Sequence, residues 1–213
     1  MKPKGTTRKP AVGLLIALLL APLAALSAAD APKPNILVIV ADDMGYADCG
    51  AQGCRDVPTP HIDSLAQQGI RFTDGYVSGT VCSPTRAGLM TGRYHYRDGI
   101  HNWVPPGKPG LNAGVPTVAG YLQSAGYHTG IVGKWHLGEQ PECHPLKRGF
   151  DEFFGFLGGG RSYFPNQPKG ADAKINLYTQ MLRGNEPVAV REYTTHDFGR
   201  EAVEFIQRRK GSK

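Results

Sequence analysis

The chain has 213 residues, of which 40% are hydrophobic and 20% are charged, an ordinary composition for a globular protein with one core. One domain is therefore expected. The formal net charge is +6, but four of the basic residues precede Ala11, so the remainder is only mildly basic. So small a positive charge does not indicate a nucleic-acid-binding protein, which needs a surface with clustered basic and aromatic residues.

The N-terminal residues 1–29 read as a targeting segment. Basic residues are followed by an apolar run from Ala11 to Leu26, and then by the small residues Ser27, Ala28 and Ala29. This order is typical of a signal peptide, here cleaved after Ala29. The run is shorter than the roughly 20 apolar residues of a spanning helix. We expect an exported protein, periplasmic or extracellular, with no stable membrane span after cleavage.

Strand and helix patterns alternate along the rest of the chain. The continuously apolar segment 36–40 predicts a parallel strand covered on both faces, and it ends at Asp42-Asp43. A short helix is predicted to start at Thr59-Pro60 and to stop at Gly69. A second helix is predicted from Thr117 to Gly126, followed by a strand over 127–132. This order predicts an open α/β sheet, with ligands gathered beyond the carboxyl ends of its strands.

The segment 138–170 is rich in Gly, Pro and aromatic residues and predicts a long ordered loop. Its aromatic side chains either shape a substrate pocket or pack against the core. A last helix is predicted with Phe198, Ala202, Phe205 and Ile206 on its apolar face. The basic run that begins at Arg208 is interpreted as the solvated end of this helix.

The cysteines leave two structural alternatives open. Cys49 and Cys54 are close enough in sequence for a disulfide in an exported protein, although pairing cannot be deduced from spacing. A zinc site built from Cys49, Cys54, Cys143 and His144 lacks the usual paired Cys-x2-Cys spacing and is disfavoured.

The segment from Cys82 to Arg93 carries the strongest chemical pattern. Pro84 suits the first turn of a helix and Gly92 suits its end, so Cys82 is predicted at a helix N-terminus. Such an end attracts anions through free N–H groups and the helix dipole, and Arg86 would add a fixed cation one turn later. A cysteine before a helix is more often structural than catalytic when it is taken alone.

The surrounding residues reverse that preference. Cys82-x-Pro84-x-Arg86, followed by Thr91-Gly92-Arg93, resembles the motif of type I, arylsulfatase-like sulfatases, in which a maturation enzyme oxidises the cysteine to formylglycine. Thr85 stands where the family more often has Ser. The resemblance extends in order from about residue 35 to 206.

Two further blocks resemble family motifs. Asp42-Asp43 resembles the first metal-binding pair, and two adjacent carboxylates indicate calcium, with magnesium as the alternative. The resemblance implies that the metal is held by Asp42, Asp43 and the modified Cys82. In Gly133-Lys134-Trp135-His136-Leu137-Gly138, it implies that Lys134 contacts the sulfate and that His136 holds a hydroxyl of the hydrated formylglycine.

Residues 59–63 and 148–151 also match family segments, and we assign them structural roles. Lys134 and His136 would project to the same side of an extended chain, with Trp135 packed behind them.

The resemblance implies a fold and a reaction. The fold is the alkaline phosphatase-like three-layer α/β sandwich with a mostly parallel sheet, incomplete in this chain because family motifs with a further His, an Asp-Asn pair and a Lys lie downstream. Residues 30–213 would be the N-terminal part of the catalytic domain. The hydrated aldehyde from Cys82 would attack sulfur and expel the alcohol, with Arg86 and Lys134 neutralising the sulfuryl group.

The predicted function is hydrolysis of sulfate esters on aryl groups or carbohydrates. The expected partners are a sulfated small molecule or glycan and the formylglycine-generating maturation enzyme. Two alternatives stay open: a phosphate or phosphonate monoester hydrolase with the same nucleophile, and an inactive truncated remnant.

Overall fold

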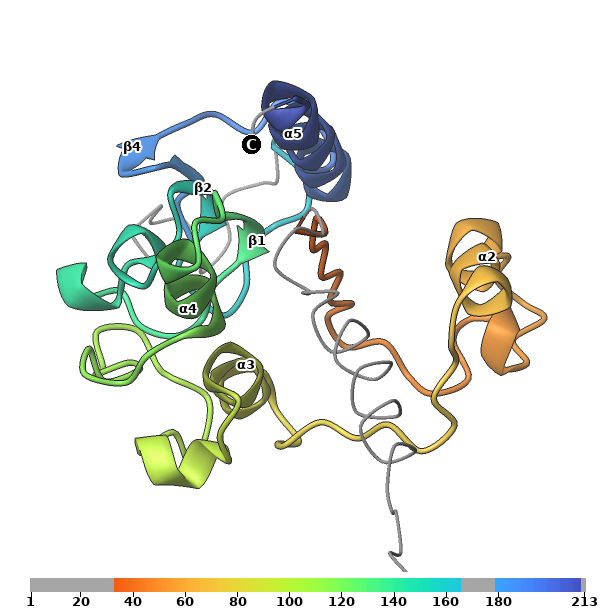
Figure 1. The fold of residues 1–213 in the computed structure, drawn as a ribbon, viewed down its shortest axis with the longest axis horizontal. Coiled ribbons are helices and arrows are strands. Elements are labelled where there is room, and N and C mark those ends of the chain that lie inside the picture. Colours follow the sequence, from red (N-terminus) through yellow and green to blue (C-terminus); the bar gives the residue numbers. More distant parts are fainter. Residues whose placement is uncertain (1–32, 166–178, 212–213) are drawn as a thin grey trace, which may run out of the picture. The chain divides into compact units, whose positions relative to one another are not determined.

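The computed structural model describes residues 33–165 and 179–211 (Figure 1). The chain divides into two compact units, Met1–Met44 and Gly45–Lys213, which are described separately. The predicted signal peptide over 1–29 lies outside the described residues, as does the end of the predicted loop from residue 166 to 170. Within the described part of the chain, no helix is both long and apolar enough to cross a membrane.

Among residues 33–165 and 179–211, the helices and strands all lie in the second unit. Its α-helices are α2 (Pro60–Gln68), α3 (Cys82–Thr91), α4 (Val118–Ser124) and α5 (Thr194–Arg209). Its short 3-10 helices are η1 (Gly50–Gln52), η2 (His95–Asp98), η3 (Pro141–Cys143) and η4 (Pro145–Lys147). Its strands are β1 (Gly130–Lys134), β2 (Glu152–Phe156), β3 (Leu182–Arg183) and β4 (Glu186–Pro187).

The strands form one sheet in the order β1-β2-β3-β4. β1 and β2 are parallel, whereas β2–β3 and β3–β4 are antiparallel. Gly133 lies opposite Gly155, and a Cβ atom added at Gly155 would be 1.8 Å from the Gly133 carbonyl oxygen. The parallel strands β1 and β2 therefore approach each other at a point where a side chain does not fit.

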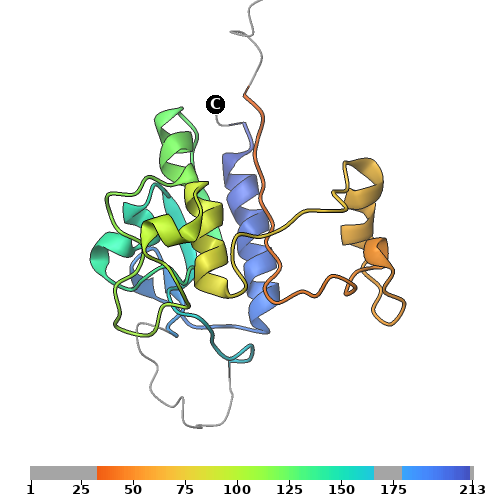
Figure 2. The same ribbon diagram turned by 90° about the horizontal axis from the view of Figure 1, so that it is seen from below.

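Helices cover both faces of the sheet (Figure 1). Phe154 and Phe156 lie on one face of β2, because alternate residues of a strand point the same way, and both rings contact Phe198 of α5. Phe153 points to the other face, where it joins a buried cluster that includes Ala87 of α3. Figure 2 gives the same arrangement from below, with α5 in blue beside the sheet. The predicted α/β class is confirmed.

The predicted helices are confirmed with small shifts at their ends. Thr117 caps α4 by accepting a hydrogen bond from the Gly120 N–H at 3.1 Å. α2 begins at Pro60 and is followed by Gly69, as its sequence predicts. The strand predicted over 127–132 begins only at Gly130 and continues to Lys134, so Lys134 belongs to the strand itself.

Two predictions about secondary structure are wrong. Segment 36–40 forms no strand, and its five apolar residues are between 48% and 75% exposed. A strand needs a neighbour to take its backbone hydrogen bonds, and no described strand pairs with it. The segment from residue 138 is no continuous loop, because β2 lies within it and buries Phe153, Phe154 and Phe156. Of the two readings of its aromatic residues, the structure favours core packing for these three.

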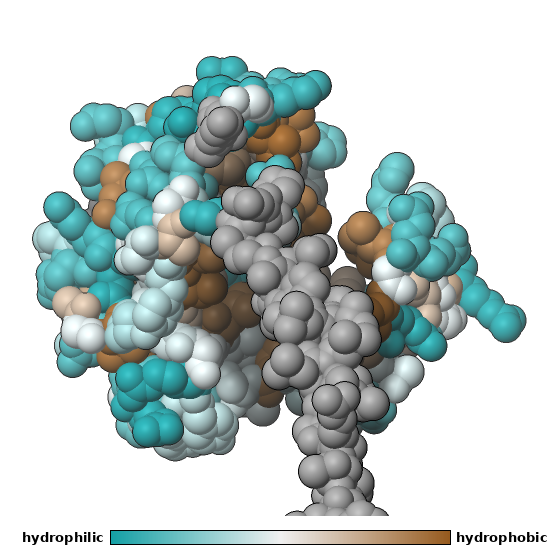
Figure 3. Space-filling model, in the orientation of Figure 1, coloured by the Kyte–Doolittle hydropathy of each residue, from teal (hydrophilic) through white to brown (hydrophobic). Residues whose placement is uncertain are grey.

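Apolar side chains are exposed on several helices of the second unit. Hydrophobic surface is visible over α5 and on α2 in Figure 3. On α2, Ile62 is 44% and Leu65 is 63% exposed, and no residue of this helix is buried. On α5, Val203 and Ile206 are both about half exposed. The described residues thus leave the predicted apolar face of α2 open, whereas on α5 Phe198 packs against β2 and Ile206 remains exposed.

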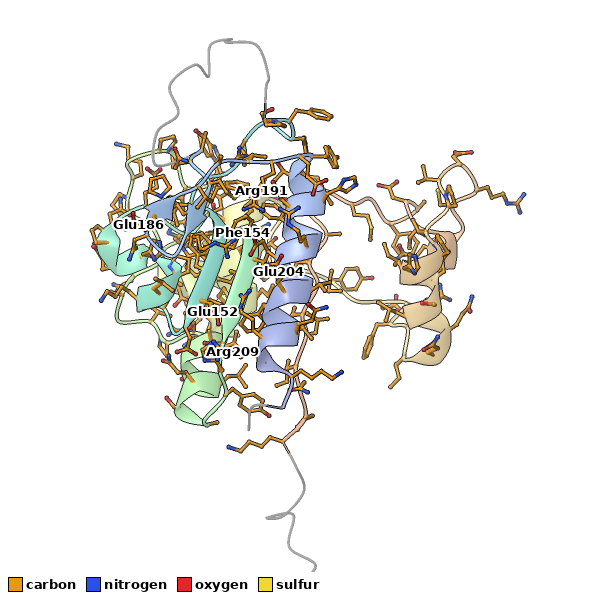
Figure 4. All side chains as sticks on the ribbon, turned by 90° about the horizontal axis from the view of Figure 1, so that it is seen from above. Glu152, Phe154, Glu186, Arg191, Glu204 and Arg209 are labelled. Atoms are coloured by element: carbon orange, nitrogen blue, oxygen red, sulfur yellow. The ribbon has the colours of Figure 1, made fainter. Side chains whose placement is uncertain are left out.

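The C-terminal basic run is attached to the sheet and is no free solvated helix end. Glu152, the first residue of β2, accepts hydrogen bonds from Arg209 and, at 2.9 Å, from Arg208 (Figure 4). His128 Nε2 lies 3.0 Å from the same carboxylate. Burial opposes ionisation of Glu152, but these hydrogen bonds outweigh it and lower the pKa of Glu152 to about 2.

We predict that Glu152→Gln lowers the free energy of unfolding at pH 7 by about 1 to 2 kcal/mol, because charge-assisted hydrogen bonds to α5 are lost. In the wild type, this contribution is present above the ordinary glutamate pKa and is lost as the pH falls through about 2. Urea unfolding at several pH values measures both effects. The matched control is Glu204→Gln, since Glu204 makes only an exposed contact to Arg208 at 3.8 Å. Equal stability of the two variants would contradict the prediction.

Candidate active site

Cys82 is the first residue of α3, as its sequence context predicts. The N-cap residue is Val81, whose side chain makes no capping hydrogen bond. The backbone N–H groups at the start of α3, including those of Cys82 and Ser83, therefore receive no hydrogen bond acceptor from the N-cap side chain. A helix start of this kind favours a bound anion. Cys82 itself is partly exposed, so its sulfur is accessible at this end of the helix.

Arg86 connects α3 with the end of β1. It lies four residues after Cys82 and so shares a helix face with it. Its Nη1 donates a hydrogen bond to the Lys134 carbonyl oxygen at 2.6 Å. The side chain of one predicted site residue is thereby fixed against the backbone of another, although the two are 48 positions apart in sequence.

The peptide of Val104 makes a second connection between the same two elements. Its N–H donates to Ser83 Oγ at 2.9 Å, and its carbonyl oxygen accepts from His136 Nε2 at 3.1 Å. Ser83, Val104 and His136 are all buried. The Val104 peptide thus links Ser83, the residue after Cys82, to the imidazole of His136. His136 therefore lies close to the start of α3.

His136 has an unusual backbone conformation. It has a φ of 58°, and with Asp43, at 59°, it makes up the non-glycine residues of positive φ in the described ranges. Such residues are uncommon and cluster at functional sites, because the surrounding structure must compensate for their cost. Both belong to the predicted site. Since the extended chain ends before His136, the expectation that Lys134 and His136 project together from an extended segment does not apply.

Trp135 occupies the core position that was predicted for it. It is 1% exposed, and its Nε1–H donates to the Cys143 carbonyl oxygen at 2.9 Å. Its neighbours Gly133 and Gly138 have positive φ values of 119° and 113°. The glycines at both ends of this block therefore allow backbone conformations that fix the indole in the core and turn the chain at His136.

Residues 59–63 and 148–151 have the structural roles that were predicted for them. The guanidinium of Arg148 is buried and donates to the backbone carbonyls of Asn112, Ala113 and Val115. Asp63 accepts from the Ala51 N–H at 2.6 Å and so joins α2 to η1. Arg93 forms an ion pair with the buried carboxylate of Asp98 at 3.0 Å, which stabilises the turn that follows α3.

The predicted metal ligands do not all lie in one unit. Asp42 and Asp43 belong to the first unit and Cys82 to the second. No cluster of three or more His, Cys, Asp or Glu side chains suitable for a metal occurs among residues 33–165 and 179–211. All four cysteines are free thiols, and Cys49 donates to Gln52 Oε1 at 3.1 Å in place of a bond to Cys54.

A cavity of about 380 Å³ lies between the sheet and α5, away from Cys82. Its lining includes Glu152, Glu201 and Phe205. Both carboxylates are already paired, Glu152 with Arg208 and Glu201 with Arg183. With its charges satisfied internally, this cavity offers less to an anionic ligand than the start of α3.

Comparison with known proteins places the chain in a family. The family model described as Sulfatase matches residues 34–213. The chain belongs to the sulfatase family. It is similar to arylsulfatase G of Canis lupus familiaris, with 35% identity over 204 residues that cover 84% of this chain and 38% of that protein. N-acetylgalactosamine-6-sulfatase of the same species is 43% identical over 92% of this chain and 40% of that one.

Several solved structures have the same fold. The crystal structure of Ps i-CgsB matches with a TM-score of 0.78 and 41% identity, over 83% of this chain and 42% of that one. The same protein in complex with k-i-k-neocarrahexaose gives a TM-score of 0.79. The predicted alkaline phosphatase-like fold class is confirmed by these neighbours. This sulfatase chain spans about 40% of the length of the relatives that it matches.

Sequence reasoning missed the residues that organise the site. Ser83 and Val104 are 21 positions apart, and Val104 and His136 are 32 positions apart. Val104 contributes through its peptide group, which every amino acid other than proline has in full. No local pattern in the sequence of this sulfatase could have indicated these contacts.

We predict that Ser83→Ala destabilises the second unit by about 1 to 3 kcal/mol, because the buried N–H of Val104 loses its acceptor. Urea unfolding measures the change. Ser124→Ala is the control, since Ser124 Oγ donates an exposed hydrogen bond to the Gly120 carbonyl oxygen of α4, and its loss should alter stability by less than about 0.5 kcal/mol. If the two substitutions had the same effect, the Ser83–Val104 contact would not hold the site together.

Proposed function

We propose that this chain carries the nucleophile and part of the sulfate-binding machinery of a sulfuric ester hydrolase. The observation that carries the proposal is the position of Cys82 at the start of α3, with Arg86 fixed against the end of β1, in a chain that the sulfatase family model matches over residues 34–213. An anion-favouring helix start, a cation and a modifiable sulfur come together there.

Cys82 would be oxidised to formylglycine by a maturation enzyme. Once hydrated, this group would supply a hydroxyl nucleophile for the sulfur atom of the ester. Arg86 and Lys134 would place positive charge where negative charge develops on the sulfuryl oxygens. His136 would hold a hydroxyl of the nucleophile, and its ring orientation is restricted by the hydrogen bond to Val104.

Asp42 and Asp43 would hold the divalent metal, calcium or magnesium. Their carboxylates are the hard oxygen donors that both ions prefer, and the left-handed backbone of Asp43 is the kind of strained position that functional sites retain. The modified Cys82 would supply a third oxygen ligand. When bound, the ion would polarise an oxygen of the substrate or nucleophile.

The proposed substrate is a sulfated glycan or another sulfated small molecule. Support comes from relatives that are named for sulfated sugars or solved with an oligosaccharide. We also propose that the protein is exported, since its first 29 residues have the order of a signal peptide.

Formation of the nucleophile is tested by replacing Cys82. For the complete gene product, produced together with a formylglycine-generating enzyme, we predict hydrolysis of 4-nitrophenyl sulfate and a loss of at least about 1,000-fold in kcat/KM for Cys82→Ala. Mass analysis of the wild-type peptide should reveal an aldehyde in place of the Cys82 thiol.

The same assay distinguishes the alternative functions. Faster hydrolysis of 4-nitrophenyl phosphate than of 4-nitrophenyl sulfate would favour the phosphate ester hydrolase, and a protein inactive on both esters would be the inactive remnant.

The metal role of Asp43 is tested with a substitution that keeps the backbone. Asn tolerates positive φ nearly as well as Asp, so Asp43→Asn removes the charge without adding strain. We predict at least about tenfold weaker calcium binding, measured by calorimetry on the complete protein stripped of metal with a chelator. Asp56→Asn, at an exposed position, should bind calcium like the wild type. Unchanged affinity of Asp43→Asn would remove Asp43 from the metal site.

A further inference from the structure

The segment that joins η2 to the Val104 peptide presents an exposed indole beside the candidate active site. Trp103 is 47% exposed, and its ring centroid is 6.4 Å from that of His136. A tryptophan that is half open to water and lies next to a candidate catalytic histidine has both an apolar ring face and a polar N–H within reach of a ligand bound there.

The backbone on both sides of Trp103 is fixed. Its own N–H donates to Asn102 Oδ1 at 2.8 Å. The next residue, Val104, is buried and is held between Ser83 and His136 by the two hydrogen bonds described above. The indole is therefore presented from a rigid point that is connected to both the nucleophile helix and the histidine.

The loop before Trp103 is equally well anchored. His95 Nδ1 donates to the Ile100 carbonyl oxygen at 2.7 Å, and Asp98 pairs with Arg93. Tyr96 and His101 lie against each other with ring centroids 4.8 Å apart. The loop that carries the indole is thus preorganised, and a ligand can bind there without the entropic cost of ordering a flexible loop.

We propose that Trp103 determines specificity by stacking on the pyranose ring that carries the sulfate ester. A sugar ring has an apolar face of C–H groups and a rim of hydroxyls, and an indole half open to water can cover the first while leaving the second solvated. The inference rests on the proposed function, since it places the sulfate toward Cys82 and the sugar against Trp103.

The chain contains two tryptophans, Trp103 and the buried Trp135, so fluorescence can test the contact directly. In the complete protein, galactose 6-sulfate should change the emission of the wild type and of Cys82→Ala, which keeps Trp103. The change should be at least severalfold smaller in Trp103→Phe, because that variant lacks only the indole proposed to stack on the sugar and keeps Trp135 and any tryptophan outside this chain. A ligand-induced change of the same size in Trp103→Phe as in the wild type, or no change in the wild type, would overturn the proposal.

Kinetics provide the second test. Trp103→Ala should raise KM for galactose 6-sulfate about tenfold with little change in kcat, while Trp103→Tyr restores most of the affinity. Turnover of propyl sulfate, which has no ring, should not change. Tyr121→Ala, on the exposed side of α4, is the control for loss of a surface aromatic ring.

The outcomes separate this inference from the proposed function. Hydrolysis of sulfate esters that is equally efficient in the wild type and in Trp103→Ala would retain the function and reject the role of Trp103. A loss on 4-nitrophenyl sulfate without a loss on galactose 6-sulfate would also reject the pyranose assignment. Absence of sulfate ester hydrolysis from the wild type would reject the function, while fluorescence still reports whether Trp103 binds the sugar.

Discussion

The start of α3 and the end of β1 are held together by three buried or partly buried hydrogen bonds, and the candidate active site depends on them. Arg86 binds the Lys134 carbonyl oxygen, while the Val104 peptide joins Ser83 to His136. Each bond uses a backbone group, so the geometry follows from the path of the chain. Small changes in that path would separate Cys82 from Lys134 and His136 at once.

The same elements belong to the core, which explains why the site can be rigid. Ala87 of α3, Trp135 and Leu137 after β1, and Val104 itself are all members of one buried cluster. The side chains that would do chemistry are therefore neighbours in sequence of side chains that fill the core. This alternation of packing and functional residues lets a partly exposed site rest on well-packed elements.

Much of this arrangement could be predicted from local patterns. Helix ends that are marked by capping residues, such as Thr117 before α4 and Gly92 after α3, were predicted to within a few residues. This works because capping depends only on residues close in sequence. Segment 36–40 was misjudged because a strand depends on partners that its own sequence does not specify. β2 was missed because its Gly and aromatic residues have the composition of the surrounding loop, and only their burial in the structure distinguishes the strand. The resemblance to family motifs identified four candidate site residues: Cys82, Arg86, Lys134 and His136. Three further residues beside the site were found only from the structure: Ser83, Val104 and Trp103.

The left-handed backbone at His136 has a consequence for how this position can vary. Asn, Asp and Gly accept such a conformation with little penalty, whereas Val and Ile do not, since their branched side chains collide with the backbone. Replacement by a branched residue would perturb folding before it reported on chemistry. Substitution during evolution is restricted in the same way: few amino acids can replace the imidazole at this position, and an asparagine there would remove the imidazole while leaving the backbone intact.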